Sequence, residues 1–362
     1  MTTVIRVGLV GYGDVGRIHA LAWRSIPFYY PGEEWRVEVV AVATSREETA
    51  AAAARDTGAS FWTTDVEELV AHPDVDLVDC VTPDDTHAAV SIAALRAGKH
   101  VYCEKPMART VEEARAMLDA ARASGTVNAV AFPVRFAPAV LRARRLVDGG
   151  LLGRPISFRT SLLHSGYVDP SRPMSWRLDA GRAAGGALFD LGAHNVDLIR
   201  FLVGEFASVT ARVETVVPER PAVSGSKDTR TVDVDDLAIA LAELEGGAVG
   251  TLEFSRVATG ITEGPLLEVH GTEGAFRLNA LRPTRLEVFE RGRDEGFREV
   301  VVPERWPQLG FVPLQYEVAN AVVERRPAAV TFEDGYRAQV VMDAIRIAGQ
   351  KRSWVDVPSD RP

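Results

Sequence analysis

Residues 1–132 alternate short apolar runs with segments that favour helix. Val4 to Val10 is almost continuously β-branched or aliphatic, and similar runs recur at Val37 to Ala43, Val75 to Val81 and Val127 to Phe132. Continuous apolar runs are typical of strands buried on both faces. Helix-prone segments separate these runs, so the pattern predicts βαβ units and an α/β domain with a parallel sheet over residues 1–132.

The pattern changes after about Gly153. Strand-like runs separated by turn signals predict an α+β domain over residues 133–335, with a large, open, mostly antiparallel sheet. One strong helix, about Gly186 to Leu202, interrupts the strands, and residues 218–231 read as a loop. Residues 336–362 are expected to form a C-terminal helix and tail that pack back near the first domain. The expected strands are Ile156–Leu163, Ser208–Val217, Leu237–Leu244, Ala248–Arg256, Leu266–His270, Ala275–Leu278, Arg285–Glu290 and Glu299–Val302.

Composition narrows the class of protein. The 362 residues are 46% hydrophobic and 25% charged, as expected of a globular chain long enough for two domains. A net charge of −9 argues against nucleic-acid binding. With no signal peptide and no long apolar run, we expect a cytoplasmic protein without a membrane segment. Cys80 and Cys103 lie in apolar runs, so we expect reduced core thiols and no metal site.

A glycine-rich turn follows the first apolar run. Gly11-Tyr12-Gly13-Asp14-Val15-Gly16 opens a helix-prone segment, which is the context of a dinucleotide-binding loop. Gly11 would permit the tight turn, Gly13 the approach of a pyrophosphate, and Gly16 close packing of the helix. The free N–H groups of the helix would face the phosphates. The alternative is a purely structural turn.

The end of the second strand bears on the choice between NAD and NADP. In an NAD site, an aspartate or glutamate usually stands there and forms a hydrogen bond with the ribose 2′-hydroxyl. Here the sequence reads Ala43-Thr44-Ser45-Arg46. A hydroxyl and a guanidinium suit a 2′-phosphate, so these residues favour NADP over NAD. The alternative is that Arg46 is a solvated residue at the start of a helix.

Two further polar groups follow predicted strands. Thr82 to Asp85 comes after the run that ends at Val81, and Glu104-Lys105-Pro106 comes after Val101 to Cys103. In parallel sheets, ligands bind beyond the carboxyl ends of the strands. Lys105 is therefore expected at the ligand-binding edge, although a solvated charge pair is the simpler explanation of the tripeptide taken alone.

The predicted helix of the second domain carries an acid and a histidine four residues apart. Asp190 and His194 would share one helical face, among the apolar residues Leu188, Leu191 and Val196. An aspartate one turn before a histidine can accept the imidazole N–H, fix its tautomer and hold it for proton transfer. The alternative is a surface ion pair.

Taken together, these motifs resemble the Gfo/Idh/MocA oxidoreductase family, which includes glucose–fructose oxidoreductase and inositol dehydrogenase. The resemblance covers about residues 4–205. It rests on the glycine loop and, in order, on Thr82-Pro83-Asp84-x-x-His87, Glu104-Lys105-Pro106, Arg135-Phe136-x-Pro138, Trp176-Arg177 and Gly186…Asp190-x-Gly192-x-His194.

The resemblance implies a Rossmann-type first domain and specific roles for its residues. Lys105 would be catalytic beside the nicotinamide, together with Asp190 and His194, and the Lys105–Pro106 bond would be cis. The cofactor would be bound by the glycine loop and residues 44–46, together with Thr82, Pro83, His87 and Glu104. Asp84 departs from the asparagine common in the family. Relatives of this kind are often dimers or tetramers through the second-domain sheet, so a homodimer or homotetramer is expected.

The expected reaction moves a hydride between NAD(P) and a secondary alcohol or ketone of a sugar or cyclitol. His194 would accept the hydroxyl proton, and Asp190 would orient the His194 ring. Lys105 would hydrogen-bond to the reacting oxygen. Which of Lys105 and His194 is the base stays open. The expected substrate contacts are Arg135, His164, Tyr167, Trp176 and Arg177. The alternatives are a redox-neutral enzyme that keeps NAD bound, of a glycosidase or epimerase kind, and a non-catalytic nucleotide-binding protein.

Overall fold

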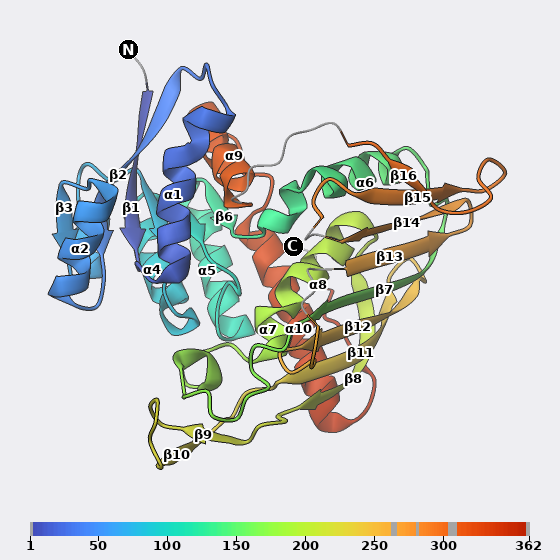
Figure 1. Cartoon of the computed structure of the whole chain (residues 1–362). Coiled ribbons are helices and arrows are strands. Elements are labelled where there is room, and N and C mark those ends of the chain that lie inside the picture. The colour runs from blue at the N-terminus through green and yellow to red at the C-terminus, as the bar shows by residue number, and fades with distance from the viewer. Residues whose placement is uncertain (1–2, 262–265, 280–281, 303–309, 360–362) are drawn as a thin grey trace. The chain divides into compact units, whose positions relative to one another are not determined.

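The computed structural model describes residues 3–261, 266–279, 282–302 and 310–359. The chain divides into two compact units, each made of two stretches of sequence. The first unit comprises Met1–Pro133 and Pro307–Tyr336, and the second comprises Val134–Trp306 and Arg337–Pro362 (Figure 1).

The first unit is built on a six-stranded sheet in the order β3-β2-β1-β4-β5-β6, with every neighbouring pair parallel. This confirms the predicted α/β domain and its parallel sheet. Its strands are β1 (Thr3–Val10), β2 (Trp35–Ala43), β3 (Phe61–Thr63), β4 (Leu77–Cys80), β5 (His100–Cys103) and β6 (Asn128–Val130). Its helices are α1 (Asp14–Tyr29), α2 (Glu47–Thr57), α3 (Val66–Ala71), α4 (Asp84–Arg96), α5 (Val111–Ser124) and α9 (Phe311–Glu324), with the 3₁₀ turn η1 (Pro133–Phe136) at its boundary.

The strand ends of this sheet bring the predicted polar groups together. β1, β4 and β5 are neighbours, and hydrogen bonds continue past their ends from Val81 N to Val10 O (2.8 Å) and from Glu104 N to Cys80 O (2.9 Å). The loops that follow these three strands therefore share one edge of the sheet. This edge carries the glycine loop, Thr82 and the Glu104-Lys105-Pro106 segment.

The second unit contains a nine-stranded sheet in the order β16-β15-β14-β13-β7-β12-β11-β8-β17. Its neighbouring strands are antiparallel except for β7 and β12, which confirms the predicted open, mostly antiparallel sheet. The strands are β7 (Pro155–Leu163), β8 (Phe206–Glu214), β11 (Leu237–Leu244), β12 (Val249–Ser255), β13 (Leu266–Gly271), β14 (Gly274–Asn279), β15 (Leu286–Glu290), β16 (Arg298–Val300) and β17 (Val355–Asp356).

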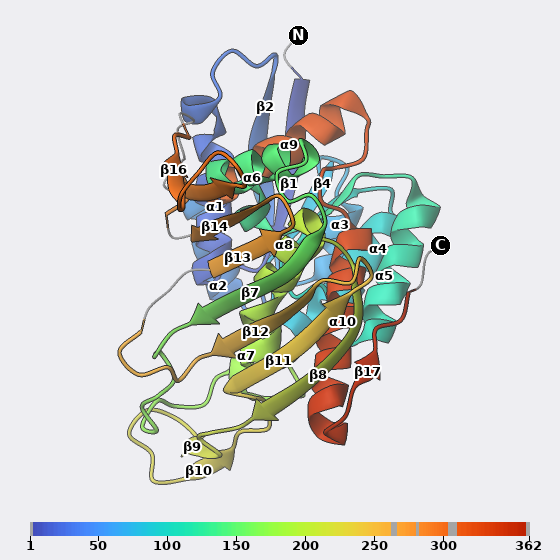
Figure 2. The ribbon, with the colours of Figure 1, turned by 90° about the vertical axis from the view of Figure 1, so that its right-hand side faces the viewer.

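One face of this sheet is packed and the other is open. Along β11, Ala238, Ala240 and Ala242 are buried, whereas Ile239 and Leu241 are 46% and 50% exposed. This alternation is typical of a strand with one face on the core. Figure 2 shows strands β7, β12, β11 and β8 in front, with α8 and α10 behind them. The helices are α6 (Pro138–Asp148), α7 (Ala187–Asp190), α8 (Gly192–Leu202) and α10 (Phe332–Lys351), with the 3₁₀ turn η2 (Trp176–Leu178).

The second unit differs from the sequence prediction in two places. The expected helix from Gly186 to Leu202 is interrupted at Leu191 into α7 and α8. Part of the expected loop at 218–231 pairs as a two-stranded ribbon of β9 (Glu219–Pro221) and β10 (Thr229–Thr231). The C-terminal segment from Arg337 groups with the second unit, where β17 pairs with β8 and Gly349 lies against Val213, and its packing near the first domain stays a prediction.

The start of α7 is held by a neighbouring strand connection. A Cβ placed on Gly186 would lie 1.6 Å from the carbonyl oxygen of Asp235, so the backbones touch there. The Asp235 carboxylate accepts hydrogen bonds from the backbone N–H groups of Gly186 and Leu188, both at 2.8 Å. A buried carboxylate thus serves the free N–H groups of the first turn.

Among the described residues, no helix has both the length and the apolar composition needed to cross a bilayer.

Candidate active site

The glycine loop at the end of β1 has the geometry of a phosphate-binding turn. Gly11 has a φ of +98°, and a Cβ there would lie 2.4 Å from Val81 O. A Cβ on Gly16 would lie 2.5 Å from Gly11 O, so the start of α1 packs directly on the turn. A Cβ on Gly13 would meet nothing within 4 Å, which leaves its backbone open to a ligand.

The N-terminus of α1 is available to a phosphate. Gly13 caps this 16-residue helix, so no side chain occupies the first N–H groups. Tyr12 and Val15 pack beside the core cluster around Leu9, Asp14 is exposed, and the Arg17 guanidinium lies 4.7 Å from the Tyr12 ring centroid. The turn, the open backbone at Gly13 and the uncapped helix fit a dinucleotide pyrophosphate.

The residues after β2 leave a guanidinium in solvent. The Thr44 hydroxyl lies 2.6 Å from Thr49 Oγ1 and donates to Arg46 O at 3.0 Å, so the turn into α2 is fixed. Ser45 and Arg46 are exposed, and Arg46 is the N-cap of α2 with extended backbone. The first acids, Glu47 and Glu48, lie in the first turn of α2.

Thr82 to His87 forms a braced loop at the start of α4. Pro83 is the N-cap of α4, and Thr86 donates to Thr82 Oγ1 at 2.6 Å. His87 is fully buried, with Nε2 2.9 Å from Thr82 O and Nδ1 3.0 Å from Pro106 O. Burial lowers the pKa of His87, but the charges of Cys80 and Asp84 and the contacts with the two carbonyl oxygens outweigh burial and raise it above its ordinary value. His87 thereby ties the loop after β4 to the loop after β5.

Cys80, His87 and Cys103 place their donor atoms within 4.8 Å of one another. The two cysteines are register partners on β4 and β5, and both are buried free thiols, as expected. The hydrogen bond from Cys103 lowers the pKa of Cys80 to about 6, and burial raises the pKa of Cys103. Both nitrogens of His87 lie within 3.0 Å of carbonyl oxygens, so His87 would have to give up one of these contacts to ligate a metal beside the two sulfur atoms.

The Glu104-Lys105-Pro106 segment is fixed by its own glutamate. The Lys105–Pro106 bond is cis, as the resemblance implies. Glu104 is buried, and its Oε2 accepts the backbone N–H of Lys105 at 3.0 Å. Lys105 is half-buried at the same sheet edge as the glycine loop. Glu104 therefore acts on the backbone that presents the lysine.

Sequence reasoning missed a buried histidine beneath this segment. His19 of α1 has no exposed surface, with Nδ1 3.0 Å from Asp79 Oδ1 and Nε2 3.0 Å from Glu104 Oε1. Trp23 donates its indole N–H to Asp79 Oδ2 at 2.7 Å. The available signal was Asp79 itself, a charged residue inside the otherwise apolar strand Leu77–Cys80.

In the second unit, Asp190 lies at the end of α7 and His194 in the first turn of α8. Both are half-buried, and the break at Leu191 lies between them. The Asp190 carboxylate accepts a hydrogen bond from Arg256 Nη2 at 3.0 Å. The Asp190–His194 hydrogen bond stays a prediction.

Arg256 contacts several predicted site residues, and the sequence did not reveal this role. It follows β12, is 1% exposed, and donates to Arg177 O as well as to Asp190. Its guanidinium lies 4.9 Å from the Tyr167 ring centroid. Burial, followed by the charge of Arg256, lowers the pKa of His164. Arg256 thus connects Asp190 with three of the five predicted substrate residues: His164, Tyr167 and Arg177.

These predicted substrate residues are exposed to different degrees. Tyr167 is 7% exposed, with the Arg172 guanidinium 4.1 Å from its ring centroid. His164 is half-buried and accepts the Gly166 N–H at 2.9 Å. Trp176 and Arg177 are half-buried in η2, with the Arg177 guanidinium 4.4 Å from the indole.

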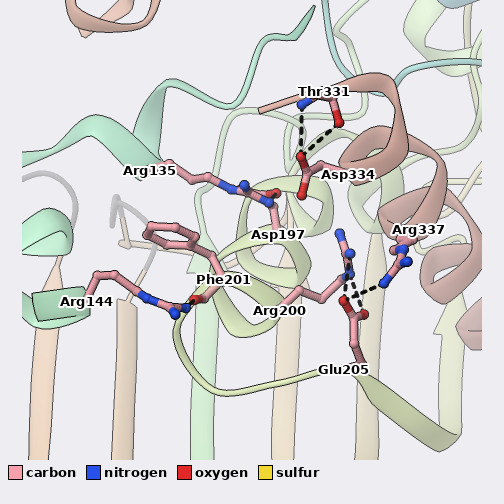
Figure 3. Close-up of polar contacts among 9 residues, drawn as sticks. All are labelled: Arg135, Arg144, Asp197, Arg200, Phe201, Glu205, Thr331, Asp334 and Arg337. Atoms are coloured by element: carbon pink, nitrogen blue, oxygen red, sulfur yellow. Dashed lines mark hydrogen bonds and ion pairs between the residues drawn. The ribbon is translucent and has the colours of Figure 1, made fainter. Parts of the chain in front are cut away.

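Arg135, the fifth predicted substrate residue, lies in an internal ion pair. Its Nε donates to Asp197 Oδ2 at 2.7 Å and its Nη2 to Asp197 Oδ1 at 2.5 Å, with both side chains buried (Figure 3). The guanidinium also lies 4.9 Å from the Phe201 ring centroid. A two-point pair of this kind fixes η1 against α8, so Arg135 has a structural role in the second unit.

Comparisons with known proteins agree with this geometry. Residues 5–132 match a family described as an oxidoreductase family with an NAD-binding Rossmann fold, and residues 140–277 match the GFO/IDH/MocA C-terminal domain. The levoglucosan dehydrogenase of Pseudarthrobacter phenanthrenivorans is 37% identical, over 98% of each chain. The inositol 2-dehydrogenase of Rhizobium meliloti is 30% identical, over 96% of this chain and 98% of its own.

A solved structure shows the same fold over the whole chain. A levoglucosan dehydrogenase in complex with NADH and levoglucosan superposes with a TM-score of 0.93 and 36% identity, over 98% of this chain and all of its own. The matches cover both units and the predicted motifs. This chain belongs to the Gfo/Idh/MocA family of NAD(P)-dependent oxidoreductases that act on CH–OH groups.

Proposed function

We propose that this protein is a dehydrogenase that oxidises a secondary hydroxyl of a sugar or cyclitol. The observation that carries the proposal is Lys105, which follows β5 at the same sheet edge that carries the glycine loop after β1. The similarity to dehydrogenases of levoglucosan and inositol supports this substrate class.

The first unit would hold the cofactor. Residues 11–16 would receive the pyrophosphate, residues 44–46 the adenosine ribose, and Thr82, Pro83, His87 and Glu104 would complete the site beside Lys105. The chemistry that a nicotinamide supplies when bound is hydride acceptance from the reacting carbon. The protein must then orient the hydroxyl and remove its proton.

Lys105, His194 and Asp190 would divide these tasks. Nζ of Lys105 would donate a hydrogen bond to the reacting oxygen, and a ring nitrogen of His194 would accept the hydroxyl proton. Asp190 would stabilise the imidazolium that forms. The ion pair with Arg256 would hold the Asp190 carboxylate in place for this role. His164, Tyr167, Trp176 and Arg177 are the proposed substrate contacts.

We further propose that Thr44, Ser45 and Arg46 decide between the two forms of the cofactor. The family is described as NAD-binding, and the levoglucosan dehydrogenase structure contains NADH. In this chain, an exposed guanidinium stands at the end of β2 with no acid before Glu47. An arginine there can pair with a 2′-phosphate, so the protein would prefer NADP.

The open face of the second-unit sheet is the proposed subunit interface. Ile239, Leu241 and Val249 are each about half exposed on adjacent strands β11 and β12. Exposed apolar side chains gathered on one face favour association. We propose a homodimer or homotetramer formed through this face.

The absorbance of reduced nicotinamide tests the proposed reaction. Purified protein is mixed with NAD or NADP and with levoglucosan, aldopyranoses and inositols in turn. We expect stoichiometric reduced cofactor with at least one compound, and a roughly 10²–10⁴-fold loss of kcat in Lys105→Ala. Lys227→Ala is the matched control, because Lys227 is an exposed residue of the loop between β9 and β10.

Two outcomes would contradict the dehydrogenase. Conversion of a sugar without any net reduced cofactor would indicate a redox-neutral enzyme. Full activity of Lys105→Ala, with Lys227→Ala as reference, would remove Lys105 from the chemistry. His194→Asn measured across pH separates the two candidate bases, since only the variant that lacks the base loses the pH-dependent rise in kcat.

A further inference from the structure

A buried charged network lies in the first unit between α1 and the loop after β5. The His19 ring has Nδ1 3.0 and 3.1 Å from the two carboxylate oxygens of Asp79, and Nε2 3.0 Å from Glu104 Oε1. His19 and Asp79 have no exposed surface, and the Glu104 side chain is 9% exposed. The proposed reaction uses neither His19 nor Asp79.

The geometry fixes the protonation of His19. A carboxylate can only accept a hydrogen bond, so a ring with carboxylates at both nitrogens donates twice and is an imidazolium. Burial alone would lower the pKa of His19. The charges and hydrogen bonds of Asp79 and Glu104 outweigh burial and raise this pKa to about 10.

Aromatic and amide side chains also contact the imidazole or its partners, and these side chains carry no charge. Tyr102 of β5 stacks on it at 5.1 Å between centroids, and burial raises the pKa of this phenol well above its usual value. Phe311 of α9 lies 4.7 Å away, and Gln315 donates to His19 O at 3.3 Å. Trp23 satisfies the second oxygen of Asp79. The imidazolium and the two carboxylates together carry a net charge of −1.

This group reaches Lys105 through Glu104. Oε1 of Glu104 meets His19, while Oε2 accepts the backbone N–H of Lys105 at 3.0 Å. On the far side of the lysine, Pro106 O receives a hydrogen bond from His87. Two buried histidines thus act on the backbone around Lys105: His19 acts through the Glu104 carboxylate on the Lys105 N–H, and His87 contacts the carbonyl of the next residue, Pro106.

We propose that His19 is a positioning residue for Lys105: it aims the Glu104 carboxylate at the lysine peptide and offsets one of the two buried negative charges beside it. This inference rests on the proposed function only in so far as Lys105 takes part in the reaction. Without the imidazolium, two carboxylates would remain, and they would stabilise the lysine ammonium.

The test measures the titration of Lys105 directly. The chain has four lysines, so acylation of Lys105 by acetic anhydride can be followed peptide by peptide across pH, with Lys227 as an internal reference. In His19→Gln we expect the pKa of Lys105 to rise by about half a unit or more, which slows its acylation about threefold at a given pH. We expect Lys227 to be unchanged and kcat to fall about tenfold with little change in the KM for the sugar.

His100→Gln is the matched control. His100 begins β5, is half-buried, and accepts the Val127 N–H at the opposite end of the strand from Glu104. The proposal would be overturned if His19→Gln lost only heat stability. In that case its Lys105 titration and its kcat would equal those of His100→Gln.

Asp79→Asn provides a second, opposite test that does not require His19→Gln to fold. It removes one negative charge while keeping the shape of the side chain, so the pKa of Lys105 should fall in this variant. A rise, or no change, would also overturn the proposal. Acylation of Lys105 can be measured without turnover of a substrate. If the titration of Lys105 shifted in a protein that oxidises no sugar, the proposed function would be rejected and the coupling of His19 to Lys105 would stand.

Discussion

At the scale of single residues, the proposed chemistry depends on groups that buried neighbours hold in place. Lys105 is held at its N–H by Glu104 and at the next carbonyl by His87, and Asp190 is held at its carboxylate by Arg256. Fixing a reacting group in this way reduces the entropy lost in reaching the transition state. The holding residues are more buried than the groups they hold.

Arg46 gives the prediction at this scale. Replacing it with alanine removes the exposed guanidinium that would pair with a 2′-phosphate. We expect kcat/KM for NADP to fall about tenfold or more in Arg46→Ala, while kcat/KM for NAD changes little. Steady-state kinetics with both cofactors measure this.

Arg55→Ala is the control for that experiment, since Arg55 is an exposed arginine in the last turn of the same helix, α2. Equal losses with NAD and NADP in Arg46→Ala would exclude a specific role at the phosphate.

The sequence revealed the residues proposed to contact ligands better than the residues that hold them in place. Lys105 and the glycine loop occur in short motifs with a fixed order, so their chemistry can be read from one chain. His19, Asp79 and Arg256 come from separate elements, and only the fold brings each to its partner. The sequence also did not reveal that Arg135 pairs with Asp197 in the interior of the second unit, and its predicted contact with a sugar stays a prediction.

At the scale of elements, α1, β4 and β5 share one buried ionic group. The sign of its pH effect follows from His19, whose pKa of about 10 lies above its unfolded value near 6.5. A raised pKa means that the folded state holds the proton more tightly. The stabilisation is therefore complete below about pH 6.5 and is lost as pH rises from there towards 10.

We expect this loss to appear as a difference between two proteins. The free energy of unfolding of the wild type, minus that of His19→Gln, should shrink steadily between about pH 7 and 10. Urea unfolding at several pH values measures it, and titrations common to both proteins cancel in the difference. A difference that stays constant over this range would show that His19 keeps the same protonation state in the folded and unfolded chains.

Elements with a strong local pattern were predicted, and those that depend on tertiary contacts were not. β11, for example, spans the predicted residues Leu237–Leu244. The break at Leu191 was missed because residues 186–202 read as one apolar helix. β3 and β17 are too short to carry a pattern of their own and form only by pairing with β2 and β8.

At the scale of the whole molecule, association through the second-unit sheet would cover the side chains on its open face. Leu241 is 50% exposed in β11, with Thr251 and Thr210 opposite it on the neighbouring strands. A lysine there would place a charge within an apolar contact between two such faces.

We expect Leu241→Lys to convert the assembled protein into a folded monomer. Sedimentation or light scattering measures the mass, and circular dichroism checks the fold. Val323→Lys is the matched control, because Val323 is a surface valine of α9 in the first unit and is 37% exposed. If the mass of Leu241→Lys were unchanged, the interface would lie elsewhere. If the wild type were a monomer, there would be no such interface.

The division of the chain into two units has a consequence for how this architecture can be recombined. Helix α9 belongs to the nucleotide-binding unit but follows the second sheet in sequence, and it supplies Phe311 and Gln315 to His19 and stacks Tyr316 on Tyr30 at 3.8 Å. A gene fragment that ends near codon 133 would therefore encode the Rossmann sheet without part of its core. Exchange of cofactor specificity between relatives by swapping halves must transfer two separate stretches of coding sequence, whereas point substitutions at residues 44–46 avoid that constraint.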